Sequence, residues 1–238
     1  QETEAQRVRL TITQNVFDDS RPSPARGAVV RVVSDGGTTT PFAERADSAG
    51  VYGAIGMRLE RGSRLTLRIT WQGDEYESSE TVRPAVAMDS LFFLPDTRSS
   101  TPAGLRATLA ARDPAGTRNF YLWEQWVDGR RIIQPDSETF ARVVASDELF
   151  DGGRVRSFQP YAVTVDSGQL VRMRQLSISE QAYRFYQMLS EQTTNSGSPF
   201  GVPAGNVRGN IANLTRPERL GLGYFIVAEY SELERRVP

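Results

Sequence analysis

The chain has 238 residues, a net charge of -1, and neither histidine nor cysteine; its sequence also contains no lysine, so every basic side chain is an arginine. This length can form one large or two small domains whose core needs no disulfide or metal staple. The missing residue types exclude zinc–thiolate sites, Ser–His and cysteine nucleophiles and lysine-dependent phosphate loops. Carboxylate chemistry and oxygen-ligated metals remain open, and our overall expectation is no enzyme activity, no bound metal and no cofactor.

The charge pattern and the hydropathy pattern limit the partners. Arginines are scattered among the acidic residues instead of forming a basic stripe, which argues against a nucleic-acid partner. No run of 18 apolar residues is present, so no segment is predicted to cross a membrane as a helix. The chain also starts without Met or a signal peptide, and we expect it to be a mature, exported product.

The first part of the chain contains short alternating segments that predict half-buried β-strands. They are residues 7–13, 28–33, 52–57 and 65–71, the last followed by a Gln72-Gly73-Asp74 turn into Tyr76. Strands of this length, each with one polar face, are typical of a small antiparallel sandwich. We predict an immunoglobulin-like or carboxypeptidase-regulatory-like β-sandwich as a first domain over residues 1–87.

The remainder predicts a larger β-rich domain over residues 88–238. Its expected strands are residues 91–94, 105–111, 120–127, 161–165 and 169–176, and Asp128-Gly129 predicts a tight hairpin after the third of them. Overall we predict a mostly β fold with one packed α-helix.

That helix is predicted over about residues 178–193. Ser177-Ile178-Ser179-Glu180 matches a capping box, and Ala182, Phe185 and Leu189 follow on one face. Residues 223–230 are apolar on both faces, so we expect them to form a central strand on which this helical stripe packs.

One aromatic segment is a weak candidate for ligand binding. Tyr121, Trp123 and Trp126 belong to the predicted strand 120–127 and have flat apolar rings that can stack on sugars. Alternation places Tyr121 and Trp123 on one face with Phe120 and Leu122 on the other. At least one of these sets is therefore expected to pack in the core.

Two carboxylate hypotheses are open at this stage. Residues 147–152 contain three acids, but Leu149 and Phe158 occupy positions where an EF-type calcium loop needs oxygen ligands, so a charged turn is favoured. A glycosidase needs two acids brought together from separate strands. The candidates are Glu124, Glu138, Asp147 and Glu148, and the sequence alone does not pair them.

Several motifs occur in a family-specific order. They are Leu176-Ser177-Ile178-Ser179-Glu180-Gln181-Ala182-Tyr183-Arg184-Phe185-Tyr186, Ser196-Gly197-Ser198-Pro199-Phe200, Val207-Arg208-Gly209-Asn210-Ile211 and Leu222-Gly223-Tyr224-Phe225, preceded by Gly50-Val51-Tyr52 and Ser146-Asp147-Glu148-Leu149-Phe150-Asp151-Gly152. In this the chain resembles the Bacteroidota lipoprotein family named domain of unknown function 4249, over nearly its whole length. The resemblance provides no catalytic residues.

The resemblance implies an outer-membrane, cell-surface lipoprotein that accompanies a TonB-dependent β-barrel transporter of the starch-utilisation type. The anchoring cysteine of that family is missing here, so the lipid attachment is expected upstream of Gln1. The acidic start at residues 1–4 resembles the acidic tags of surface-exported lipoproteins. No metal or cofactor is implied.

A loop near the end supplies a weak candidate for docking on the partner. Pro199, Phe200, Val202 and Pro203 form an apolar cluster within a Ser-, Gly- and Pro-rich segment at residues 195–205. The alternative is that Phe200 packs back under the helix. We expect a non-catalytic docking protein, for which ligand capture is an additional role to consider. The alternative functions are a carbohydrate-active hydrolase that uses two carboxylates, and a structural component of a surface assembly.

Overall fold

The computed structural model describes residues 6–14, 20–57, 60–96, 104–132, 143–195 and 207–238. The chain forms two compact units, Gln1–Val82 with Arg208–Val227, and Arg83–Val207 with Ala228–Pro238. The first boundary lies close to the predicted residue 87. The second unit, however, does not hold the whole remaining chain, because Arg208–Val227 returns to the first unit.

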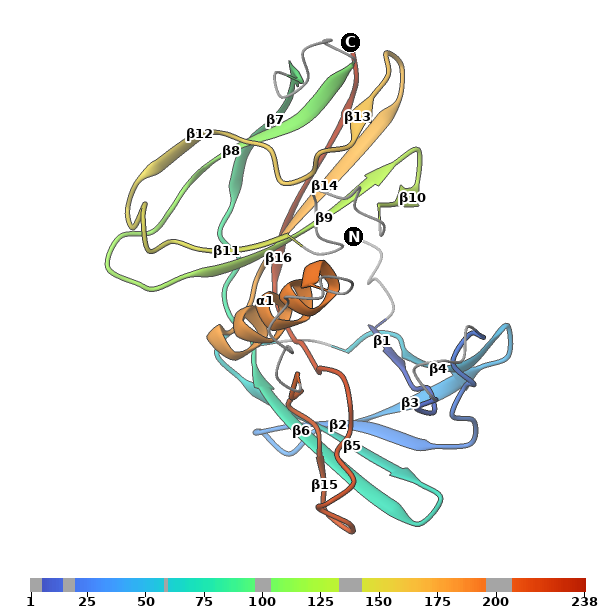
Figure 1. The fold of residues 1–238 in the computed structure, drawn as a ribbon. Coiled ribbons are helices and arrows are strands. Elements are labelled where there is room, and N and C mark those ends of the chain that lie inside the picture. The colour runs from blue at the N-terminus through green and yellow to red at the C-terminus, as the bar shows by residue number, and fades with distance from the viewer. Residues whose placement is uncertain (1–5, 15–19, 58–59, 97–103, 133–142, 196–206) are drawn as a thin grey trace. The chain divides into compact units, whose positions relative to one another are not determined.

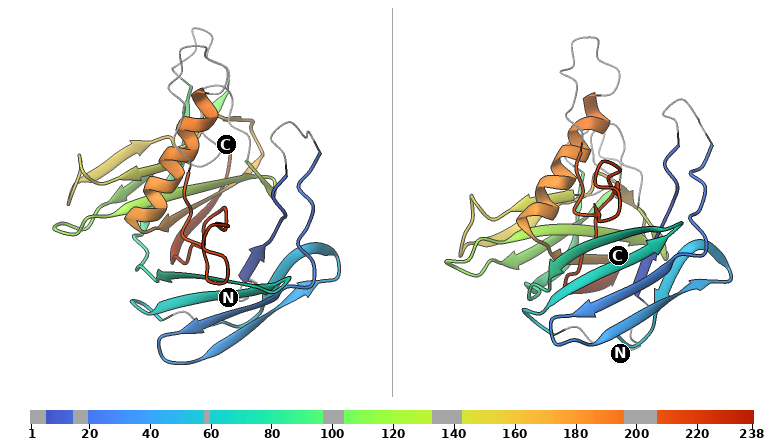
Figure 2. Two further views of the ribbon diagram at one scale, coloured as in Figure 1. Left: turned by 60° about the horizontal axis from the view of Figure 1, so that its bottom comes forward. Right: turned by 90° about the horizontal axis from the view of Figure 1, so that it is seen from below.

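The first unit is built on one antiparallel sheet of seven strands, which is seen in both views of Figure 2. Its order is β1-β4-β3-β2-β5-β6-β15. The strands are β1 (Gln6–Arg9), β2 (Val29–Ser34), β3 (Thr39–Arg45), β4 (Ser48–Ala54), β5 (Arg64–Trp71), β6 (Asp74–Thr81) and β15 (Ala212–Asn213). The ladder is continuous and curls, so the predicted immunoglobulin-like sandwich is not confirmed.

The core of the first unit follows from the alternation seen in the sequence. Leu65, Leu67 and Ile69 on β5 are buried, while the side chains between them face outward. They pack with Val30 and Val32 of the neighbouring β2 in one apolar cluster. The predicted hairpin after β5 is present, with Gln72 and Gly73 at φ 49° and 82°, the left-handed geometry that a two-residue turn requires.

The second unit contains two sheets (Figure 1). In one, the order is β10-β9-β14-β16 with β11 also on β9; in the other, β8 pairs with β7, β12 and β13. The strands are β7 (Met88–Pro95), β8 (Leu105–Arg112), β9 (Phe120–Val127), β10 (Arg130–Arg131), β11 (Val143–Ser146), β12 (Arg154–Phe158), β13 (Thr164–Val165), β14 (Leu170–Ser177) and β16 (Tyr230–Arg236).

One apolar cluster joins the two sheets of this unit. It includes Leu91 and Leu109 from one sheet and Trp123, Val171 and Met173 from the other, all at most 4% exposed. The predicted hairpin at Asp128-Gly129 is present, with both residues at positive φ. The prediction of a mostly β protein with one helix is confirmed among the described residues.

The helix α1 (Glu180–Asn195) lies close to its predicted position. Its N-cap is Ser179, whose hydroxyl accepts the Ala182 amide at 3.2 Å, instead of Ser177 as the capping-box pattern suggested. The Ser177 hydroxyl instead accepts the amide of Val86 at 3.2 Å. Helix α1 contacts β9 and β11, and among the described residues no helix is long and apolar enough to span a membrane.

The predicted packing of this helix is wrong in two respects. Ala182 and Phe185 are buried at 0% and 8% exposure, but Leu189 is 41% exposed. Residues 223–229 form no strand; β16 begins at Tyr230 and is an edge strand that pairs with β14. The apolar side chains of Phe225 and Val227 instead complete the core of the first unit.

Candidate functional site

The surface of the β10-β9-β14-β16 sheet opposite the core carries a cluster of aromatic and charged side chains. Register pairs Arg131 and Arg172 with Trp126 on either side. In the next row Arg174 lies between Glu124 and Glu232. We call this cluster the Arg–Trp face; it comprises Glu124, Trp126, Arg131, Arg172, Arg174, Tyr230 and Glu232.

Three guanidinium groups surround the half-buried indole of Trp126. The central carbon of Arg172 lies 4.4 Å from the ring centre, that of Arg174 5.1 Å and that of Arg131 5.9 Å. Arg174 also lies 4.0 Å from the ring centre of Tyr230. Cations at these distances are attracted by the ring quadrupole, so the aromatic rings hold the arginine side chains in place.

Carboxylates neutralise two of these three cations. Arg174 donates to Glu232 from Nη2 at 2.7 Å and from Nε at 2.8 Å, and Arg131 pairs with Glu124. Arg172 has no ion pair among the described residues; Glu234 is opposite it in register but beyond ion-pair distance. Arg172 therefore keeps N–H donors for an external acceptor while its guanidinium lies over the ring of Trp126.

The other two predicted ligand-binding aromatics lie in the core. Tyr121 and Trp123 are 3% and 4% exposed. The Tyr121 hydroxyl donates to Asp113, and the Trp123 indole N–H donates to Gln175 Oε1 at 2.9 Å. Burial, followed by the hydrogen bond to Asp113, raises the pKa of Tyr121 far above its usual range, which keeps this donor protonated. Only Trp126 of the three lies on the opposite, open face.

The predicted docking residues Pro199, Phe200, Val202 and Pro203 lie outside the described residues. Within the Arg–Trp face, Trp126 and Glu124 were candidates from the sequence, but the arginines around them were not predicted. The sequence feature that could have predicted this face is the alternation of Arg172 and Arg174 with the apolar Val171 and Met173, which are buried on β14.

Three carboxylates meet at the turns joining β8 to β9 and β11 to β12. Oxygens of Asp113, Asp147 and Asp151 lie within 4.8 Å of one another, the kind of donor set that hard cations accept. Each is already used by the backbone: Asp147 accepts from Asn119 N at 2.7 Å and Asp151 from Gly116 N at 2.8 Å. Asp113 accepts from Gly152 N at 3.1 Å, so the cluster ties the turns together.

The glycosidase candidates are also engaged in local contacts. Glu124 is paired with Arg131, and Asp147 is 1% exposed and caps the turn at Asn119. Glu148 is exposed and lies 3.8 Å from Arg118. Glu138 lies outside the described residues. Glu124 and Asp147 therefore have structural partners, whereas Glu148 has a long ion pair between two exposed side chains.

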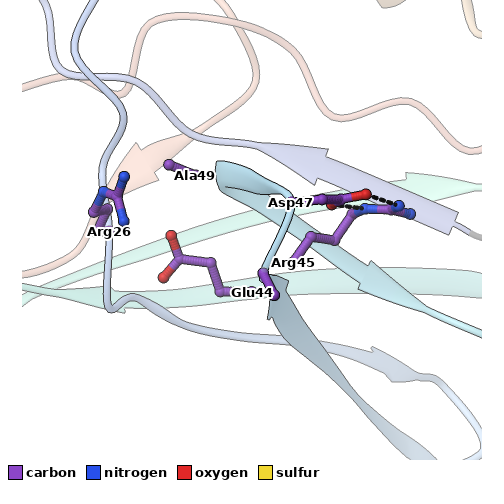
Figure 3. A pocket seen from close by; sticks show the side chains of 6 residues that line it. Arg26, Glu44, Arg45, Asp47 and Ala49 are labelled. Carbon is purple, nitrogen blue, oxygen red and sulfur yellow. Dashed lines mark hydrogen bonds and ion pairs between the residues drawn. The ribbon is translucent and has the colours of Figure 1, made fainter.

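A hollow of about 380 Å³ on the first unit is lined by Arg26, Glu44, Arg45, Ala46, Asp47 and Ala49 (Figure 3). Glu44 accepts the amides of Gly27 and Gly50 at 2.9 Å each. These two hydrogen bonds lower the pKa of Glu44 and keep it ionised. Figure 3 shows Arg45 and Asp47 paired with each other beside the hollow.

The motif Gly50-Val51-Tyr52 follows the hollow in the chain, and its contacts explain why these residue types are needed. Gly50 has φ 70°, and a Cβ there would lie 2.6 Å from the carbonyl oxygen of Leu10. The Tyr52 hydroxyl donates to Ala25 O at 2.8 Å and accepts from Ala28 N at 2.9 Å. Residues 50–52 therefore join three segments of the chain, and their role is structural.

The fold and the site together define a mostly β protein of two units, with one helix in the part of the chain that the structure describes and with the Arg–Trp face on one of its sheets. A family model described as domain of unknown function (DUF4249) matches residues 1–234, and the chain belongs to this family. A comparison with curated proteins gives no match.

Proposed function

We propose that the protein is a non-catalytic docking protein that assists a TonB-dependent β-barrel transporter at the outer membrane, to which a lipid upstream of Gln1 anchors it. The observation that carries the docking role is the Arg–Trp face. Trp, Tyr and Arg are the residue types that dominate the binding energy of protein interfaces. Trp126, Arg172 and Tyr230 gather here around Arg174, which is itself only 9% exposed. The outer-membrane setting is supported by the family resemblance.

The geometry favours a protein partner over capture of a sugar. A sugar ring needs a bare aromatic face on which to stack. The ring of Trp126 instead has guanidinium groups of Arg172, Arg174 and Arg131 around it. Arg131 and Arg174 are paired with carboxylates, so Arg172 is the group that offers N–H donors beside the ring, and such donors select carboxylates and carbonyls of a complementary protein surface.

A lipid anchor makes even a modest interface sufficient. Confinement to one membrane raises the effective concentration of anchored protein and barrel to roughly the millimolar range. Among the described candidates, Glu124 and Asp147 have structural partners, which supports a docking role over a two-carboxylate hydrolase.

The test is recovery of the barrel from outer membranes solubilised in mild detergent, with the lipidated protein as bait. Trp126→Ala and Arg172→Glu are each expected to weaken the complex by about 2 kcal/mol or more, the range of interface hot spots. Arg156→Glu is the matched control, because it makes the same charge change at an exposed position of β12 in the other sheet.

Three outcomes decide the proposal. The proposal is supported if the Trp126→Ala and Arg172→Glu variants no longer recover the barrel while the Arg156→Glu variant still does. Recovery that is equal for all variants removes the Arg–Trp face as the interface. If the wild-type lipoprotein recovers no barrel, the docking function is rejected.

A further inference from the structure

Residues 210–225 form a loop that is closed at its neck. The side-chain amide of Asn210 donates to the carbonyl of Phe225 at 2.9 Å and accepts the amide of Phe225 at 2.8 Å. A β-bridge joins Ile211 to Gly221. A Cβ on Gly209 would collide with the carbonyl oxygen of Gly223, so the two chain segments at the neck are in direct backbone contact. We call residues 210–225 the leucine loop.

The far part of the leucine loop is fastened to the sheet of the first unit. Strand β15 pairs with β6, and Leu214 N donates to Glu75 O at 2.7 Å. Glu75 N in turn donates to the hydroxyl of Thr215 at 2.9 Å. Arg216 donates from Nε to the buried Asp74 at 2.6 Å, with a second hydrogen bond from Nη2. The loop is thus fixed at both its neck and its far end.

This fixed loop exposes three leucines. Leu214, Leu220 and Leu222 are 55%, 51% and 65% exposed. Phe225, in contrast, packs against the core of the same unit, and the Tyr224 hydroxyl is directed to Glu80 at 3.4 Å. The leucine side chains point outward from a backbone that is fixed by hydrogen bonds. Their exposure is therefore a feature of the folded loop.

Cations accompany the leucines. Arg208 and Arg219 are exposed, and neither has an ion pair among the described residues, whereas Arg216 is neutralised by Asp74. The only acid within the described part of residues 207–227 is Glu218. The loop together with the adjacent Arg208 therefore presents exposed leucines and, with Arg208 and Arg219 against Glu218, one more cation than anion.

We propose that the leucine loop is a membrane-contacting loop that places Leu214, Leu220 and Leu222 among the acyl chains of an anionic lipid surface, with Arg208 and Arg219 at the lipid phosphates. Leucine is under-represented among the hot spots of protein interfaces, and no aromatic side chain of the loop is exposed. A lipid surface offers both kinds of contact, because leucines can enter the layer of acyl chains while arginines bind the anionic headgroups above it.

Three leucines give only weak affinity, so this contact rests on the membrane tether of the proposed function for its occupancy. The test supplies that tether independently of lipidation. The full chain, carrying an N-terminal histidine tag, is bound to vesicles of phosphatidylethanolamine, phosphatidylglycerol and a nickel-chelating lipid. The chain has no native cysteine, so Leu222→Cys can carry a single environment-sensitive nitrobenzoxadiazole dye.

We expect the dye at residue 222 to shift to the blue on the vesicles and to be quenched by doxyl-labelled lipid. Adding Leu214→Asp and Leu220→Asp should abolish the quenching, and Arg219→Glu should weaken it in vesicles with phosphatidylglycerol. The matched control is Ile55→Cys, because Ile55 is 84% exposed in the same unit but outside the loop. Its dye should remain in water.

A dye at residue 222 that stays unquenched on vesicles while the variant melts like the wild type overturns the proposal. Equal quenching at residues 55 and 222 also overturns it, because the contact is then not made by the loop. Quenching of residue 222 that needs an added barrel protein assigns the loop to that partner and rejects the lipid contact. The assay contains no barrel otherwise, so its result and that of the docking experiment are independent.

Discussion

Two buried glutamines on neighbouring strands are expected to respond in opposite ways to the same substitution. Gln125 on β9 is 0% exposed, and its amide nitrogen and oxygen have no hydrogen-bond partner among the described residues. Gln175 on β14 is 2% exposed, accepts from the indole of Trp123 at 2.9 Å and donates to Val86 O at 3.0 Å. Methionine replaces either side chain at similar length without a polar amide.

Gln125→Met should stabilise the second unit by about 1–3 kcal/mol, since an unpaired buried amide costs that much in proteins. Gln175→Met should destabilise it by about 1–3 kcal/mol, because the Trp123 N–H and the Val86 carbonyl lose their partner inside the core. For a domain of this size each kcal/mol corresponds to a change in Tm of about 2–4 °C.

Tryptophan fluorescence during urea unfolding measures both effects. The chain has three tryptophans, so a Trp71→Phe background leaves Trp123 and Trp126 as reporters of the second unit alone. The two midpoints should move in opposite directions at equal m-value. A loss of stability in Gln125→Met comparable to that of Gln175→Met refutes the argument, because it means that the Gln125 amide is hydrogen-bonded in solution.

Three further substitutions test the packing and the electrostatics. Phe185→Ala should lower the free energy of unfolding by about 3–5 kcal/mol and Leu189→Ala by less than about 1 kcal/mol, since their exposures are 8% and 41%; similar urea midpoints for both contradict the placement of α1. Gly50→Ala should cost more than about 1 kcal/mol in the same assay, because φ is 70° and the added Cβ meets backbone; an unchanged midpoint disproves this. Arg216 holds the pKa of Asp74 below its usual range, so the stabilising effect of Asp74 is present above about pH 4 and is lost as pH falls through the lowered pKa. The Tm difference between wild type and Asp74→Asn should therefore shrink on acidification, and a constant difference down to pH 2 rejects the assignment.

Local patterns were sufficient for many secondary-structure elements. The alternation of apolar and polar side chains in residues 65–71 and the apolar side chains of residues 105–111 predicted β5 and β8. The turns at Gln72-Gly73 and Asp128-Gly129 predicted both hairpins. These features depend on neighbouring residues and on the backbone geometry that each residue type permits. Helix α1 was found for the same reason, with a shift of two residues.

The failed predictions of which side chains are buried required knowledge of long-range pairing. Residues 223–230 have the composition of a buried strand, but Phe225 and Val227 complete the core of the first unit as irregular chain. Leu189 has the spacing of a buried helical position, yet it lies beyond the part of α1 that the sheet covers. Composition shows that a side chain is apolar, but it does not show which surface is available to bury it.

For the candidate site, the sequence by itself determined the types of side chain and, through alternation, that Trp123 and Trp126 lie on opposite faces of β9. Only the tertiary structure decided that Trp123 is in the core and that Arg172 and Arg174, from another strand, meet Trp126 on the open face. Likewise only the fold brings Arg216 to Asp74. The physical reason is that face alternation is a property of each strand alone, whereas strand order and register depend on the burial and hydrogen bonding of the whole sheet.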